Sequence, residues 1–307
     1  MEIVWKDHYE LGVKSLDDDH KKLFSIAEKI SKMAKNPNAN EETRLFMMRE
    51  GVKYLKSSFA EHAAREEAFM QKQGYADYEN HKRLHDDFQQ VRIGKFEELI
   101  ESETCTKEQI FEFVGMGMGW LLEHISTEDM AIVGKGVLCK PKAPEINQQA
   151  LEQEINMLFA ATLNLNINAY VIDANYKGQN FENAIYQRFT YDKHLQPVNI
   201  ISGIEKAFLI HIAQSIYGDE LTDADVLILS SMEIFGATFW RTLGERLVNT
   251  GDGVNYRSST FLSQKQIKET FAAQKPAVSI LFGSDWGKFF FYSENHKWDQ
   301  KKWERNL

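Results

Sequence analysis

Histidines and carboxylates spaced by about one helical turn are the feature that most restricts how this chain folds. Side chains four residues apart on an α-helix project from the same face. A helix that carries such a pair can direct both groups at one point, and several such helices can enclose a polar centre. Seven candidates occur at suitable spacing in the first half of the chain: His20, His62, Glu66, His81, His85, His124 and Asp129.

Four long helical stretches carry these residues. Apolar side chains recur there at helical spacing, short polar breaks separate the stretches, and no run of alternating β-branched residues interrupts them. Gly74 is suited to end the second helix. Glycines at 115, 117 and 119 weaken the fourth but allow close approach of a neighbouring backbone. The sequence therefore predicts an all-α, up-and-down four-helix bundle over residues 1–135, with helices at 17–35, 41–73, 78–101 and 106–132.

The pattern of the sequence changes after residue 135. The stretch GKGVLCKPKAPEI combines glycine, lysine and proline, and predicts a linker at 136–146. Residues 147–307 then mix helical and strand-like patterns, which predicts an α+β domain. Helices are expected at 147–163, 205–217 and 223–248, and strands at 167–172, 184–191, 196–201, 257–262, 277–282 and 288–292.

Composition excludes several classes of function. The net charge of −9 argues against nucleic acid or an anionic membrane as the main partner, because both select clustered Lys and Arg. The N-terminus lacks the basic start and apolar run of a secretory signal, and no window reaches the ~18 consecutive apolar residues of a membrane span. We expect a cytoplasmic protein. The two cysteines, Cys105 and Cys139, are assigned no role.

The donor set indicates the kind of metal. A single histidine, or one pair, is usually a surface or core residue, and each pair alone is weak evidence. Five imidazoles with two carboxylates, spread over four helices, suit two iron ions, because carboxylates can bridge the ions while imidazoles complete each site. Zinc sites seldom need so many ligands.

The same residues resemble the bacterial hemerythrin-like domains over about residues 4–132. WKDHYELGVKSLDDDHKKLF is similar to the family's arm and first ligand, with Trp5 and Tyr9 in the arm. HAAREEAFM, HKRLH and WLLEHISTED resemble the motifs of the other three helices. Ala63 stands where the family usually has phenylalanine.

This resemblance implies a di-iron centre of the Fe–O–Fe type. His81, His85 and His124 would bind one iron, His20 and His62 the other, and Glu66 and Asp129 would bridge the two. The position left open on the two-histidine iron would take dioxygen. Four apolar residues are candidates for the lining of that position, with plain bundle core as the alternative for each: Leu122, Ile125, Phe24 and Phe69.

Nearby charged residues receive secondary roles. His8, in the arm, is interpreted as structural. Glu67 should point away from the metal-binding face, since neighbouring helical residues differ by about 100°, and we expect it to be solvated. Asp17–Asp19 favour the N-terminus of a helix, and one of them could orient a ligand imidazole.

The region 147–297 resembles the CheX-type chemotaxis phosphatases more distantly. KAFLIHIAQSIYGDELTDADVLILSSMEIFGATF is similar to that family's short helix, turn and long helix, with Glu233 at the acidic position. Gly236 replaces the family's asparagine, which argues against phosphatase activity because glycine cannot position water. Glu233 is equally interpretable as an ordinary charged residue. His194, His211 and His296 show no ligand spacing.

Three hypotheses follow. The leading one is reversible dioxygen binding by an oxygen or redox sensor, whose CheX-like domain forms a homodimer or binds a receiver-type or other chemotaxis protein. The second is dioxygen storage or delivery. The third is enzymatic: a di-iron peroxidase, a nitric oxide scavenger, or a response-regulator phosphatase that acts through Glu233.

Overall fold

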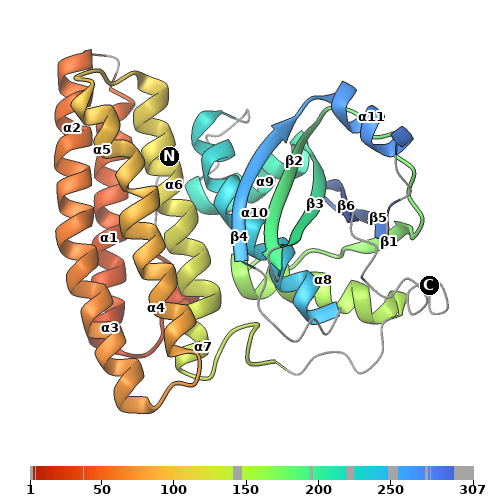
Figure 1. Ribbon diagram of the computed structural model, residues 1–307, viewed down its shortest axis with the longest axis horizontal. Coiled ribbons are helices and arrows are strands. Elements are labelled where there is room, and N and C mark those ends of the chain that lie inside the picture. The colour runs from red at the N-terminus through yellow and green to blue at the C-terminus, as the bar shows by residue number, and fades with distance from the viewer. Residues whose placement is uncertain are drawn as a thin grey trace. The chain divides into compact units, whose positions relative to one another are not determined.

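The computed structural model describes residues 3, 5–36, 38–140, 147–193, 196–218, 225–247, 255–273, 276 and 278–293. The chain divides into two compact units (Figure 1). The first contains residues 1–139 together with the short stretches 216–220 and 225–234, and the second contains the remainder. Residues 141–146 of the predicted linker lie outside the described part of the chain, as do His194 and His296.

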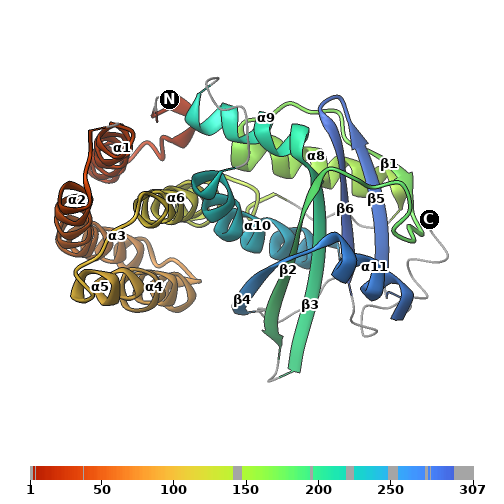
Figure 2. The ribbon, with the colours of Figure 1, turned by 90° about the horizontal axis from the view of Figure 1, so that it is seen from above.

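Four helical stretches build the first unit. Seen along their axes in Figure 2, they surround a common centre. This confirms the predicted all-α region. In chain order the stretches are α1 (Lys14–Ala34); α2, η2 and α3 (Glu41–Tyr54, Leu55–Phe59, Ala60–Gln73); α4, η3 and α5 (Tyr78–Asp87, Phe88–Arg92, Gly94–Glu101); and α6, η4 and α7 (Lys107–His124, Ile125–Asp129, Met130–Ile132).

Local chemistry sets the ends of these helices. The side chain of Asn40 accepts a hydrogen bond from the amide of Thr43, which caps α2. Thr106 and Gln109 form a reciprocal capping box at the start of α6. Gly74 ends α3 in the left-handed region, with φ +67°, as expected for a glycine at that position.

A five-residue π turn interrupts each of the last three stretches. η2 precedes His62, η3 follows His85, and η4 lies between His124 and Asp129. In a π turn the backbone bonds from residue i to i+5, which adds one residue to a turn. All three irregularities therefore lie close in sequence to the candidate ligands.

The second unit contains a six-stranded sheet in the order β1-β5-β6-β3-β2-β4, in which all neighbouring strands are antiparallel. This confirms the predicted α+β region. A helix at 264–273 was not predicted. Only residues 206–215 of α9 and 235–247 of α10 belong to this unit. In chain order, the elements after residue 147 are α8 (Gln148–Leu163), β1 (Tyr170–Asp173), β2 (Ala184–Lys193), β3 (Gln196–Glu205), α9 (Lys206–Tyr217), α10 (Val226–Leu247), β4 (Asn255–Leu262), α11 (Gln264–Ala273), β5 (Val278–Ser284) and β6 (Gly287–Ser293).

Strand β6 shows why this sheet is covered on both faces. Its aromatic residues alternate in direction, as the two-residue period of a strand requires. Phe289 packs against Phe159 of α8 and Phe208 of α9. Phe290, one residue later, packs against Phe271 of α11. The unbroken apolar run of β6 thus serves two separate cores.

Helix α10 is rich in apolar residues. Within the described part of the chain, Val226–Gly244 is the one helical segment long and apolar enough to cross a membrane by length and composition. The share of this segment that is buried is 67%, and the core helices of soluble proteins pass the same test.

Candidate metal centre

Two helices of the bundle each present a pair of candidate ligands. His62 and Glu66 lie one turn apart on α3, and His81 and His85 lie one turn apart on α4. All four residues are at most 1% exposed. The spacing read from the sequence therefore does place each pair on one inward face.

The fourth stretch uses its π turn for the same purpose. On a regular α-helix His124 and Asp129, five residues apart, would diverge by about 140°, given 3.6 residues per turn. The π turn η4 spans this interval and brings both onto the inner face, at a distance of 3.0 Å between His124 Nε2 and Asp129 Oδ1. His20 of α1 completes the set, with its Nε2 3.3 Å from Asp129 Oδ2.

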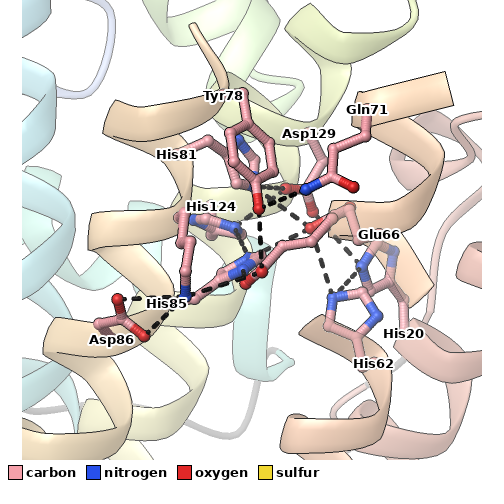
Figure 3. Close-up of polar contacts among 12 residues, drawn as sticks. His20, His62, Glu66, Gln71, Tyr78, His81, His85, Asp86, His124 and Asp129 are labelled. Atoms are coloured by element: carbon pink, nitrogen blue, oxygen red, sulfur yellow. Dashed lines mark hydrogen bonds and ion pairs between the residues drawn. The ribbon is translucent and has the colours of Figure 1, made fainter. Parts of the chain in front are cut away.

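The seven residues converge on one centre (Figure 3). Their ligand atoms fall into two groups, each within 4.8 Å, and Glu66 belongs to both. Asp129 also links the groups, because its Oδ2 faces His20 while its Oδ1 lies 3.4 Å from His81 Nε2. The first group is Glu66, His81, His85 and His124, and the second is His20, His62, Glu66 and Asp129.

The spacing of donor atoms fits cations. The Nε2 atoms of His85 and His124 are 3.0 Å apart, and those of His20 and His62 are 3.3 Å apart. At most one nitrogen of each pair can hold a proton directed at the other. Neighbouring ligands on an octahedral ion with metal–nitrogen bonds of about 2.1 Å lie about 3 Å apart. Both oxygens of Asp129 and Oε1 of Glu66 are buried and have no hydrogen-bond partner in the described part of the chain, so they too are available as ligands.

Electrostatics favour the neutral form of two of the imidazoles. Burial lowers the pKa of His20 to about 3 and holds the pKa of His124 well below its usual value. Burial opposes ionisation of Glu66, but the neighbouring imidazoles of His81 and His85 outweigh it and hold the pKa of Glu66 low. Burial and the charge of Glu66 raise the pKa of Asp129 well above its usual value. Neutral imidazole is the form that binds metal, and two crowded carboxylates ionise together only beside a cation.

Aromatic rings surround the ligands. Phe59 packs edge-on to His85, with centroids 5.5 Å apart, and Trp120 stacks on His124 at 4.2 Å. Trp5, from the arm, stacks on His20 at 6.2 Å. Each ring excludes water from one side of an imidazole and fixes its orientation.

An apolar cavity of about 40 Å³ lies in the bundle beside these rings. Its lining includes Phe59, Trp120 and Gly117, together with residues of α1 and η3. A cavity of about 15 Å³ already holds a water molecule, so this one has room for a small gas molecule.

None of the four residues predicted to line the open position lines this cavity. Phe24 packs edge-on to Trp5, and Phe69 packs against the cluster of Leu11, Leu16 and Met130. Leu122 and Ile125 are buried. Their role at the metal stays a prediction. The sequence did not single out Phe59 or Trp120, although each lies three or four residues from a ligand histidine and so faces the same way.

The charged residues beside the ligands have definite contacts. Asp17 is 6% exposed, and its carboxylate accepts hydrogen bonds from the amides of Leu11 and Gly12, which holds the arm against α1. The expectation that Glu67 is solvated was wrong. Its side chain is 18% exposed, and its Oε1 lies 3.3 Å from Nδ1 of His85.

His85 arrives from another helix, α4. Glu67 follows Glu66 on α3 and is rotated from it by about 100°, so it faces the outer edge of the His85 ring. The position of Glu67 relative to Glu66 alone could not reveal this contact.

His8 of the arm is half-buried. Its ring lies against that of Tyr9, with centroids 3.9 Å apart.

The C-terminal region of the chain offers a weaker candidate. Glu233 is half-buried on α10. A Cβ atom at Gly236 would lie 2.8 Å from the ring of Phe189 on β2. Position 236 therefore faces the sheet, and an amide side chain has no room there. His211 lies on α9 beside Trp286, with centroids 5.3 Å apart.

Known proteins resemble the two halves differently. The family model of the hemerythrin HHE cation binding domain matches residues 11–135. The chain is 31% identical over 127 residues to a bacteriohemerythrin of Clostridium acetobutylicum, which covers 41% of this chain and 95% of that protein. It is 27% identical over 131 residues to a myohemerythrin of Theromyzon tessulatum, with coverages of 43% and 91%.

Among solved structures, the chemotaxis protein CheX from Vibrio vulnificus aligns with a TM-score of 0.34 and 8% identity, over 47% of this chain and 94% of that one. A CheC-like superfamily protein from a Shewanella species gives 0.34 and 7%, over 47% and 92%. Similarity of that size supports no conclusion on activity. Through residues 11–135 this chain belongs to the hemerythrin family.

Proposed function

We propose that the first unit binds two iron ions and reversibly binds dioxygen. The observation that carries the proposal is the pair of buried four-residue groups that share Glu66. Five imidazoles and two carboxylates are a donor set suited to iron, and the shared carboxylate suits a bridged pair. All seven predicted ligands are assigned to the metals on this basis.

Each residue has a distinct task. Glu66 and Asp129 would bridge the ions and balance their charge, and His81, His85 and His124 would complete one site. His20 and His62 would hold the other ion with one ligand fewer, which leaves a coordination position for dioxygen. Bound iron supplies the electrons for reversible binding of the gas. The rings of Phe59, Trp120 and Trp5 keep water and proton donors away, which protects that reversibility.

The test is an optical spectrum of iron-loaded, anaerobically reduced protein before and after exposure to air. We expect ligand-to-iron charge-transfer bands that appear with air and disappear when the gas is removed. The measured iron content should be two per chain. Bands that persist after removal of the gas, or protein that retains no iron, would contradict the proposal.

We further propose that the second unit is the output of an oxygen sensor, acting through self-association or a receiver-type partner. The support is the fusion itself: an α+β unit with its own two-sided core follows the bundle in one chain. By linkage, a partner that dioxygen displaces must weaken dioxygen binding to the same degree. Equal sedimentation and equal partner affinity of reduced protein with and without dioxygen would contradict this half of the proposal.

One observation separates this reading from phosphatase activity. The ring of Phe189 occupies the space that an asparagine at position 236 would need. Glu233 then lacks the amide with which it would act in a CheX-type site. Storage or delivery of dioxygen is the alternative if the spectrum is reversible and the second unit does not respond.

A further inference from the structure

Two carboxylates outside the ligand set contact ligand imidazoles from behind. Oε1 of Glu67 lies 3.3 Å from Nδ1 of His85, and Oδ2 of Asp19 lies 3.7 Å from Nδ1 of His62. His85 and His62 belong to different groups of the candidate centre. Each metal position is therefore backed by one carboxylate.

The two contacts share one construction. Glu66 and Glu67 are neighbours on α3, and they contact both nitrogens of His85, Nε2 at 3.1 Å and Nδ1 at 3.3 Å. Asp19 and His20 are neighbours on α1, and they face both nitrogens of His62, with Nε2 of His20 3.3 Å from Nε2 of His62. In both cases a ligand and its sequence neighbour hold an imidazole from the next part of the bundle.

The ligand histidines differ at Nδ1. Among the described residues, Nδ1 of His20, His62, His81 and His124 is buried without a hydrogen bond, whereas Nδ1 of His85 is within hydrogen-bonding distance of Glu67. Asp19, at 3.7 Å from Nδ1 of His62, is therefore an ion-pair neighbour of that imidazole and the weaker of the two contacts.

The two carboxylates differ in how far their charge is neutralised. Arg65 donates two hydrogen bonds of 2.8 Å to Asp19, one to each oxygen. Apart from His85, the partners of Glu67 among the described residues are the Lys82 ammonium, at 3.7 Å, and the Tyr78 hydroxyl, which donates a weak hydrogen bond of 3.4 Å. That hydroxyl in turn accepts from Gln71 (Figure 3). Glu67 is nearer to its imidazole, and its contact with a cation is longer than that of Asp19.

We infer that Glu67 and, more weakly, Asp19 are positioning residues that fix the metal-binding tautomer of His85 and His62 and stabilise the oxidised metal. A carboxylate at Nδ1 holds the proton there, which leaves Nε2 free to bind and raises its basicity. A more basic ligand favours the higher charge on iron. This inference rests on the proposed function, because it assigns residues to the same centre.

Metal affinity provides the first test. Metal-free wild type, Glu67→Gln, Asp19→Asn and Glu61→Gln would be titrated with Co²⁺ against a chelator. Glu61 is the matched control, since it lies on α3 with its side chain 67% exposed. Loss of such a contact typically weakens metal binding about 10–100-fold. We expect the largest loss in Glu67→Gln, a smaller one in Asp19→Asn, and none in the control.

The midpoint potential of iron-loaded protein provides the second test. We expect it to rise in Glu67→Gln, and a tenfold loss of ferric preference corresponds to ~59 mV for one electron. Glu67→Asp, which keeps the charge, should recover part of the shift; it also serves if Glu67→Gln does not fold. Wild-type affinity and potential in both carboxamide variants would overturn the inference. A wild type that binds Co²⁺ tightly but shows no dioxygen-dependent spectrum would instead overturn the proposed function.

Discussion

The two units bury polar and apolar groups in opposite ways. The bundle places five histidines and two carboxylates, each at most 1% exposed, in its centre. The centre of the second unit is aromatic, with Phe282, Phe289 and Phe290 at most 1% exposed. Burying ionisable groups without partners costs far more than burying rings. The bundle's core therefore has the donor groups of a cation site, whereas the core of the second unit is apolar.

The strongest test of this contrast removes the shared ligand. We expect Glu66→Ala to abolish binding of the iron pair, because both groups lose a donor and a buried cation pair loses a neutralising charge. Iron content and the dioxygen-dependent spectrum measure the effect. Glu61→Ala on the same helix should retain both. Retention of two irons by Glu66→Ala would refute the assignment of the bridging carboxylate.

The next prediction concerns how the stability of each unit depends on pH once the metal has been removed. In metal-free protein, His20 titrates near pH 3 when folded and near 6.5 when unfolded. The unfolded chain therefore binds more protons between these values, so the bundle loses stability as pH falls from about 6.5 toward 3.

His124 acts in the same direction, while Asp129, with its raised pKa, partly opposes the loss. Thermal unfolding followed by near-UV circular dichroism would resolve a pH-sensitive and a pH-insensitive transition. A pH-independent bundle would contradict the burial of neutral histidines.

Close packing at Gly236 provides a test of the second unit's core. We expect Gly236→Asn to destabilise it by about 1–3 kcal/mol, because the new side chain must displace the ring of Phe189. Iron content should not change. Denaturant unfolding measures the loss, and an equally stable variant would show that the helix can move away from the sheet.

The smallest expected effect concerns the cavity. A Cβ atom at Gly117 would meet nothing within 4 Å, so Gly117→Ala adds a methyl group to the cavity without a clash and stabilises α6 by about 1 kcal/mol. We expect slower dioxygen uptake with unchanged iron content. Gly94→Ala on α5 is the matched control, because its added methyl group is also unopposed and Gly94 does not line the cavity. Equal rates of dioxygen uptake by both variants would show that dioxygen does not pass through the cavity.

The sequence predicted the parts of this molecule that depend on spacing along one helix. The pairs His62–Glu66 and His81–His85 follow from the helical period, as do the four stretches that carry them. Contacts between helices depend on how each helix is rotated, which the period does not fix. The contact of Glu67 with His85 was missed for that reason.

Helix α11 was missed for a different reason. Gln264–Ala273 is short and mostly polar, and only Ile267 of this helix is fully buried. Its contribution depends on packing against β6, through contacts such as that of Phe271 with Phe290. Such a helix is held by tertiary contacts more than by its own pattern.

The π turn η4 has a mechanical consequence. Hydroxyls of Ser126 and Thr127 bond to the carbonyl oxygens of Leu122 and Glu123, each at 2.6 Å, and so occupy acceptors that a regular helix would satisfy with amides. If the extra residue of this π turn moved into the following loop, the residues beyond Asp129 would rotate by about 100° relative to His124. A cation bound by both residues would prevent that rotation, so metal binding would fix the helical register at the C-terminal end of this stretch.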